Sequence, residues 1–203
     1  MQADPAMSQA QDTDRRPAGI ILAGGRGRRL GGIDKALCPM GNRTLGAHVR
    51  DRLLPQVATL ALNANGDPAR FAALGLPVIP DLLPDCGPLA GVLAGLDWAA
   101  SFGATRLLTA AADTPFLPLD LLDRLAAAGR PLAFAGIAED AHPTAALWPV
   151  ALREDLRAEL EGGTRRMQDA MGRLGATAVP FPDAAAFFNV NTPEDLAMAE
   201  ALQ

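Results

Sequence analysis

The residues best suited to chemistry gather near the start of the chain, in the stretch AGIILAGGRGRRLGGIDK that spans residues 18–35. A short apolar run reaches Leu22, and five glycines and four cationic side chains follow it. Glycines adopt positive φ values and let a ligand approach the main chain, so such a turn can point several N–H groups at phosphate oxygens. Guanidinium groups add paired hydrogen bonds to phosphate. The stretch therefore predicts a local anion-binding site, with a flexible, solvated basic turn as the alternative.

Lys35 closes this stretch, and it is the one lysine in a chain that contains seventeen arginines. Because arginine fills every other basic position, this exception favours a site that fits a compact ammonium group better than a planar guanidinium. Two established phosphate-binding loops do not match. A Walker A loop has a glycine directly before its lysine, and in the dinucleotide pattern GxGxxG the place of the third glycine falls on Leu30.

Composition limits the kinds of protein that can contain this site. The chain has 203 residues, of which 49% are hydrophobic, and a formal net charge of -5. This predicts one domain over residues 17–203, preceded by a polar, disordered tail over 1–16. A mildly acidic chain lacks the broad basic surface that nucleic acid or anionic lipid requires, and no apolar run is long enough to span a bilayer. Two cysteines in no metal-binding spacing fit a reducing cytoplasm.

Short apolar runs typical of strands alternate with longer helical patterns along the chain. The expected strands are residues 18–23, 59–62, 77–79, 105–112, 131–135, 143–148 and 177–181. The expected helices are residues 44–57, 68–74, 87–101, 119–128, 150–160, 165–174 and one that begins at Pro193. Such alternation predicts an α/β fold, a Rossmann-like three-layer α/β/α sandwich with a mostly parallel sheet. Ligands of these sheets bind beyond the carboxyl ends of the strands, which is where the glycine-rich stretch follows its strand.

At the level of motifs, LAGGRGRRLGGIDK resembles the signature LAGGxxxRMGGxDK of the molybdenum cofactor guanylyltransferases, which join GMP to molybdopterin. Leu30 replaces the methionine of the signature, a change of similar volume, and residues 110–112 replace the proline and cysteine that relatives often carry there. Further pieces follow in the order of the family: NAN at 63–65, VIPD ending at Asp81, GPLAG at 87–91, DTP at 113–115, HPT at 142–144 and NVNTPEDL at 189–196.

The resemblance implies a nucleotidyltransferase fold of the glycosyltransferase A-like type. Its nucleotide-binding part would span about residues 17–120 and its pterin-binding part about 121–203. The reaction would be an in-line attack on the α-phosphorus of GTP with loss of pyrophosphate, in which positioning and electrostatic stabilisation supply most of the rate. In this interpretation Arg29 and Lys35 hold the triphosphate, and Asp113 binds Mg²⁺, or Mn²⁺ in its place. Capping of the turn after its strand is the alternative for Asp113.

The resemblance also implies which residues contact GTP. A carboxylate at Asp81 can accept hydrogen bonds from guanine N1–H and the 2-amino group together, and cytosine offers no such pair of donors. Asn63 and Asp81 each end an expected strand, so both would reach the same rim, and turn formation is the alternative for both. The residues implied in GTP binding are Leu22, Ala23, Gly24, Gly25, Lys35, Asn63, Asp81 and Asp113.

The second substrate would be molybdopterin, on the side of Asn189 and Asn191. Turn formation remains the alternative for both asparagines. Arg165 and Arg166 are further candidates for the pterin phosphate, with a solvated helix face as the alternative. The capping pattern at 192–194 explains those residues without a ligand. Other cofactor-biosynthesis proteins and molybdoenzyme chaperones are candidate partners of such an enzyme.

Other activities remain open at this point. A molybdopterin cytidylyltransferase, a sugar-1-phosphate nucleotidyltransferase and a module that binds GTP without turnover share parts of the pattern. His48 and His142 lie far apart without a suitable serine or cysteine, so a hydrolase triad has little support, and a structural role is expected for His142.

Overall fold

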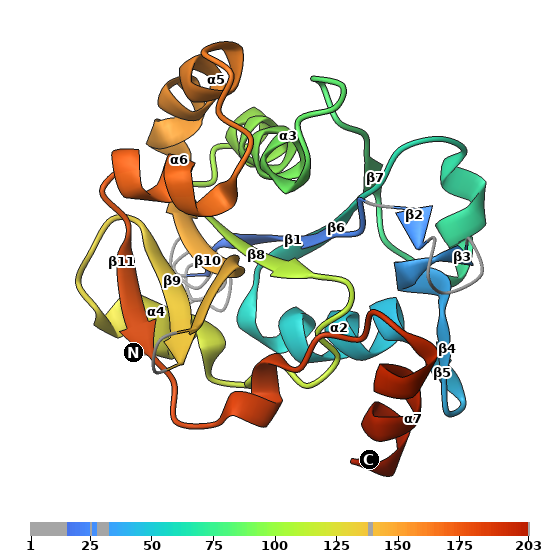
Figure 1. The fold of residues 1–203 in the computed structure, drawn as a ribbon. Coiled ribbons are helices and arrows are strands. Elements are labelled where there is room, and N and C mark those ends of the chain that lie inside the picture. Colours follow the sequence, from blue (N-terminus) through green and yellow to red (C-terminus); the bar gives the residue numbers. More distant parts are fainter. Residues whose placement is uncertain (1–15, 25, 28–32, 138–139, 203) are drawn as a thin grey trace, which may run out of the picture.

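The computed structural model describes residues 16–24, 26–27, 33–137 and 140–202. The expected disordered tail therefore lies outside the described residues, apart from the exposed Arg16. Within the described part, seven strands form one sheet in the order β11-β9-β10-β8-β1-β6-β7 (Figure 1). They are β1 (Ala18–Leu22), β6 (Thr59–Asn63), β7 (Val78–Ile79), β8 (Arg106–Ala111), β9 (Ala133–Ile137), β10 (Asp140–Pro149) and β11 (Thr177–Pro180).

Helices cover both faces of this sheet, which confirms the expected sandwich (Figure 1). On one face lie α2 (Leu45–Leu53) and α4 (Leu121–Ala127), and on the other lie α3 (Pro88–Ser101), α5 (Arg153–Glu161) and α6 (Met167–Arg173). The last helix, α7 (Pro193–Ala201), packs beside the small ribbon of β4 (Pro39–Met40) and β5 (Arg43–Thr44). Short 3-10 helices connect several of these elements: η2 (Lys35–Leu37), η3 (Leu54–Gln56), η4 (Pro68–Leu74), η5 (Val150–Leu152) and η6 (Ala184–Phe187).

The central strand β1 explains why the first apolar run has no polar side chain. Successive side chains point to opposite faces, and here both faces are covered by helices. Ile21 joins the apolar cluster on the α2 side and Ile20 joins the cluster on the α3 side, each with none of its surface exposed. β1 pairs in parallel with β6 on one side and with β8 on the other. The carboxyl ends of these three strands therefore meet at one edge.

The strand β10 departs from the simple alternating pattern. It runs antiparallel to both β8 and β9, while the other pairs of this sheet that the structure describes are parallel. It also starts earlier than expected, at Asp140. Only residues 138–139 separate it from β9, and a connection that short permits an antiparallel neighbour, whereas a parallel one needs a crossover of a dozen or more residues.

Helix α7 begins as the sequence predicts, with Thr192 as its cap and Pro193 in the first turn. Thr192 Oγ1 accepts a hydrogen bond from the Asp195 N–H at 3.1 Å, and Asp195 Oδ2 accepts one from the Thr192 N–H at 2.9 Å. The acidic partner is thus Asp195 and not Glu194, because a capping box pairs the cap with the third residue after it. None of the described helices has the length and apolar character needed to cross a membrane.

Candidate active site

Three of the predicted residues meet at the carboxyl edge of the sheet. Lys35 opens η2, Asp113 follows the end of β8, and Asn191 lies directly before the cap of α7. Lys35 Nζ lies 2.5 Å from Asp113 Oδ2 and also donates a hydrogen bond to Asn191 Oδ1. The side chains of Lys35 and Asp113 are 25% and 16% exposed, so the pair is partly shielded and still reachable by a ligand. Parts of the chain 156 positions apart therefore share one polar cluster.

Close packing beneath η2 helps to hold Lys35 at this edge. α2 lies directly against η2, and a Cβ atom at Gly46 would be only 2.8 Å from the carbonyl oxygen of Ala36. The Cys38 N–H donates to the Lys35 carbonyl at 3.1 Å, and the Leu45 N–H donates to the Cys38 carbonyl at 2.9 Å. Glycine at position 46 thus allows the helix and the turn to touch.

Backbone and side-chain hydrogen bonds fix the two asparagines beside Asp113. The Val190 N–H donates to the Asp113 carbonyl at 2.8 Å, and Thr114 Oγ1 donates to Asn189 Oδ1 at 3.1 Å. The Asn191 N–H donates to Asp195 Oδ2 at 2.9 Å. This hydrogen bond is the main reason that the pKa of Asp195 lies below its usual value. The capping carboxylate therefore also anchors the segment that carries Asn191.

Two adjoining cavities open along this edge, and they share Ala23, Gly24 and Pro88. The first has a volume of about 370 Å³ and the second about 980 Å³. The second extends over the ends of β6 and β7 and includes Asp81. The first is lined by these predicted residues: Leu22, Ala23, Gly24, Lys35, Asn63, Asp113, Asn189 and Asn191.

A ring of hydrogen bonds surrounds the carboxylate of Asp81. Asn63, which is 2% exposed, donates from Nδ2 to Asp81 Oδ1 at 2.8 Å and to the Ile79 carbonyl at 3.1 Å. Asn65 donates from Nδ2 to Asp81 Oδ2 at 2.6 Å and accepts from the Asp81 N–H at 2.9 Å. The sequence did not single out Asn65 as a site residue. Its signal was its place two residues after Asn63 in the NAN motif, beyond the same strand end.

The GPLAG motif forms the start of α3, and its last glycine has a clear steric reason. A Cβ atom at Gly91 would lie 2.1 Å from Asn63 Oδ1 and 3.0 Å from Leu22 Cδ2. Without a side chain there, α3 packs directly on the buried amide of Asn63. Pro88, in the first turn of α3, lines both cavities. The N-terminus of a helix carries partial positive charge, so this arrangement favours anions at the junction of the cavities.

Other predicted residues lie elsewhere or are not described. Gly25 and Arg29 lie outside the described residues; the flanking backbone forms the ribbon of β2 (Arg26–Gly27) and β3 (Ile33–Asp34). Arg165 and Arg166 line a separate hollow of about 310 Å³ at the start of α6 and neither of the two cavities. Arg165 Nη1 is bound to the Leu160 carbonyl at 2.7 Å.

His142 lines the 370 Å³ cavity, although the sequence suggested only a structural role. Its ring stacks on Phe187 with 4.8 Å between centroids. Burial lowers the pKa of His142, and the charge of Asp140 partly offsets this effect. The imidazole therefore favours its neutral form as part of the cavity wall.

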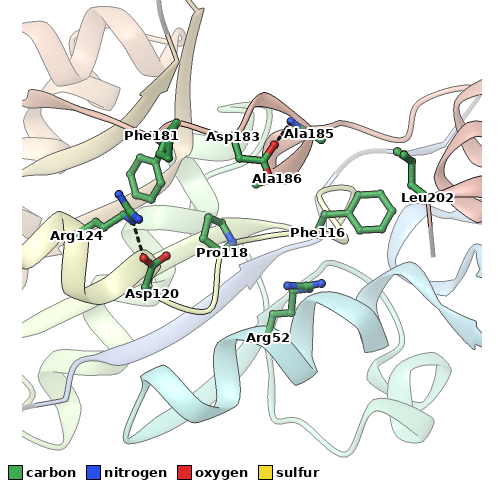
Figure 2. A pocket seen from close by; sticks show the side chains of 11 residues that line it. Arg52, Phe116, Pro118, Asp120, Arg124, Phe181, Asp183, Ala185, Ala186 and Leu202 are labelled. Atoms are coloured by element: carbon green, nitrogen blue, oxygen red, sulfur yellow. Dashed lines mark hydrogen bonds and ion pairs between the residues drawn. The ribbon is translucent and has the colours of Figure 1, made fainter.

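A further hollow of about 410 Å³ lies away from this edge, between α2, the turn before α4 and the segment after β11 (Figure 2). Its charged groups already have partners within the protein. Arg124 donates to Asp120 at 2.6 Å and lies 5.6 Å from the Phe181 ring centroid, and Arg52 donates to the Leu117 carbonyl at 3.1 Å. None of the predicted site residues lines it.

Known proteins resemble this chain in both sequence and fold. The family model described as MobA-like NTP transferase domain matches residues 19–177. A molybdenum cofactor guanylyltransferase of Cereibacter sphaeroides is 56% identical over 185 residues, covering 91% of this chain and 95% of the relative. One from Bradyrhizobium sp. is 52% identical over 194 residues, covering 91% and 92%.

Solved structures of other proteins share the fold of this chain. The molybdopterin-guanine dinucleotide biosynthesis protein A of Archaeoglobus fulgidus superposes with a TM-score of 0.72 at 24% identity, covering 91% of this chain and 97% of that one. A 2-C-methyl-D-erythritol 4-phosphate cytidylyltransferase of Thermus thermophilus reaches 0.64 at 20% identity, covering 90% and 96%. The chain is a nucleotidyltransferase enzyme and belongs to the MobA-like NTP transferase family, together with the molybdenum cofactor guanylyltransferases that it matches along most of its length.

Proposed function

We propose that this enzyme transfers GMP from GTP to the terminal phosphate of molybdopterin, with release of pyrophosphate. The observation that carries the proposal is the cluster of Lys35, Asp113 and Asn191 in the 370 Å³ cavity, which adjoins the cavity that contains Asp81. One cavity contains the carboxylate of Asp81, and the other is lined by Asn189 and Asn191. The names of the relatives, which are 48–56% identical, agree with this substrate pair.

The nucleotide would lie across the larger cavity. Asp81 presents a carboxylate that Asn63 and Asn65 hold in place, which suits the N1–H and 2-amino donors of guanine. The phosphates would extend past Gly24 and the start of α3 towards Lys35. Cytosine has no matching pair of donors, so this geometry favours GTP over CTP. That preference argues against the cytidylyltransferase alternative.

Lys35 would bind the phosphates and neutralise the charge that develops as pyrophosphate leaves. Electrostatic stabilisation of this kind requires no covalent intermediate, and the work of the protein is to hold both substrates in line. In the described structure Lys35 is bound to Asp113 and Asn191, so its ammonium group already lies beside them in the 370 Å³ cavity. Asn189 and Asn191, which line the same cavity as Lys35, would then orient the phosphate of molybdopterin.

The residues present fit Mg²⁺ bound together with the substrate. The described residues contain no group of three or more His, Cys, Asp and Glu side chains that could hold a metal ion by themselves. Mg²⁺ is commonly bound by one or two carboxylates and by substrate phosphates, which fits the single carboxylate of Asp113. The amide oxygen of Asn191 is a second hard donor close to it. When bound, Mg²⁺ or Mn²⁺ would neutralise charge on the phosphates.

The cellular setting that we propose is the cytoplasm, since Cys38 and Cys86 are both free and buried. GTP and molybdopterin are the proposed substrates, and proteins that supply molybdopterin or receive the product are the proposed partners.

The test is a transfer assay with purified protein, labelled GTP, Mg²⁺ and molybdopterin, in which pyrophosphate and dinucleotide are both measured. Release of pyrophosphate that requires molybdopterin and GTP supports the proposal. Release with CTP in place of GTP would assign the cytidylyltransferase alternative, and release with a sugar 1-phosphate would assign the sugar nucleotidyltransferase alternative. Tight binding of GTP without turnover would identify a binding module.

A further inference from the structure

Arg70 connects two parts of the proposed site that the sequence does not link. It lies on η4, after β6, and its guanidinium donates to the Asn65 carbonyl at 2.6 Å and to the Asp67 carbonyl at 3.1 Å. The same group donates from Nη1 to Asp34 Oδ2 at 2.5 Å. Asp34 is the residue directly before Lys35, and Asn65 is the residue whose side chain donates a hydrogen bond to the Asp81 carboxylate. One side chain therefore joins the segment of the phosphate-binding lysine to the loop at the base-binding end.

The helix that carries Arg70 has a side-chain cap, whereas the helix that follows Asp34 does not. On the η4 side, Asp67 Oδ1 accepts from the Ala69 N–H at 2.9 Å, and the guanidinium lies 4.9 Å from the ring centroid of Phe71, which is 1% exposed. On the other side, Asp34 caps η2 without a side-chain hydrogen bond to the backbone of that helix. The arginine thus extends from an anchored loop to a short turn whose first residue is Lys35.

We propose that Arg70 is a positioning residue for nucleotide binding. Through its ion pair with Asp34 it fixes the position of Lys35 relative to the base-binding end. The inference rests on the proposed function of Lys35 as the phosphate-binding group. A guanidinium is suited to this task because its planar fork can bind two separate acceptors at fixed angles, whereas a lysine would act as a single point of charge. Arg70 and Asp34 both line the 980 Å³ cavity, so the link borders the proposed nucleotide site itself.

The link contributes little to folding, because the Arg70 and Asp34 side chains are 40% and 24% exposed and ion pairs near the surface are weak. A matched control exists in Arg124, which is 42% exposed, donates to Asp120 at 2.6 Å and lines neither of the two cavities. The variants are Arg70→Ala, Arg70→Lys, Arg124→Ala, Lys35→Ala and the double variant Lys35→Ala/Arg70→Ala. Each is titrated by calorimetry with GTP and Mg²⁺ and, separately, with guanosine, and its Tm is recorded.

If Arg70 positions Lys35, the Arg70→Ala change weakens GTP binding on the order of tenfold or more, because small misplacements of a binding group are costly. Guanosine, which has no phosphate, loses far less affinity, and Arg70→Lys recovers part of the GTP affinity. In the Lys35→Ala background the Arg70→Ala change has no further effect on GTP. Arg124→Ala leaves both affinities unchanged.

Other results overturn the inference. Equal losses for GTP and guanosine would show that Arg70 only supports the base-binding loop. Additive losses in the double variant would show that Arg70 contacts phosphate directly, and no loss at all would show that the link is idle. Wild-type protein that binds CTP but not GTP would refute the proposed guanylyl transfer. In that case the same variants are titrated with CTP and with cytidine. The role of Arg70 in phosphate binding is then tested independently of which base the enzyme prefers.

Discussion

A methyl group added at Gly91 tests whether close packing of α3 maintains the geometry of the proposed base-binding end around Asp81. In the structure the new Cβ would lie 2.1 Å from Asn63 Oδ1 and 2.7 Å from its Cγ, whereas real Cβ atoms essentially never approach another atom within 3.0 Å. The side chain of Asn63 must therefore move. Its hydrogen bonds to Asp81 Oδ1 at 2.8 Å and to the Ile79 carbonyl at 3.1 Å would be strained or lost.

The magnitude follows from these contacts. Overpacking a buried site costs about 1–3 kcal/mol, and a buried amide left without its partner costs about 1–3 kcal/mol. Alanine regains up to about 1 kcal/mol of helix propensity over glycine, which offsets only part of that loss. We expect Gly91→Ala to lower the free energy of unfolding by about 2 kcal/mol. GTP affinity should fall by about tenfold or more, which corresponds to 1.4 kcal/mol.

The matched control is Gly172→Ala, in α6, where a new Cβ would meet no atom within 4 Å. This change should preserve GTP affinity and stabilise the fold by up to about 1 kcal/mol through helix propensity. Denaturant unfolding gives the stability of both variants, and calorimetric titration gives their affinity for GTP. If Gly91→Ala matched Gly172→Ala in both measurements, the steric account of the GPLAG motif would be refuted.

The remaining predictions concern the charged and titrating groups of the site. Lys35→Ala and Asp113→Ala should each lower kcat by about 100-fold or more with little change in Tm; single-turnover assays with near-normal rates would remove the residue from the mechanism. Asp81→Asn should reduce the preference for GTP over CTP, and an unchanged ratio of kcat/KM values would show that another group reads the base. Because burial lowers the pKa of His142, the unfolded chain binds the proton more readily, so stability falls as pH drops below about 6.5. His142→Gln should make the unfolding free energy less dependent on pH in this range, and an equally steep decline would contradict the assignment.

Local patterns in the sequence were sufficient to predict the layers of the fold. Continuous apolar runs such as β1 identify strands that are covered on both faces, and Thr192 with Pro193 marks the start of α7. The antiparallel course of β10 was not predicted, because the deciding feature is the two-residue connection to β9 and the strand boundaries were expected to lie farther apart.

The sequence predicted that several candidate site residues lie at one edge of the sheet, but it did not predict the contacts among them. Strand ends brought Asn63, Asp81 and Asp113 to one edge, as the rule for parallel sheets requires. The hydrogen bond from Asn65 to Asp81 and the ion pair between Arg70 and Asp34 depend on how the loops fold over this edge of the sheet. Nothing in the spacing of single residues specifies such contacts, since they join side chains of segments that are separate in the sequence.

The polar cluster around Lys35 has a consequence for the order in which its members are synthesised. Its last member, Asn191, is bound to a lysine that the ribosome adds 156 residues earlier. The Val190 N–H, which donates to the Asp113 carbonyl and so secures the same segment, is likewise made 77 residues after Asp113. A nascent chain therefore contains β1, β6 and β8 well before it contains Asn191, and until then the cluster around Lys35 is incomplete. The cluster is completed only once the segment of residues 189–191 has packed against Asp113 and Lys35.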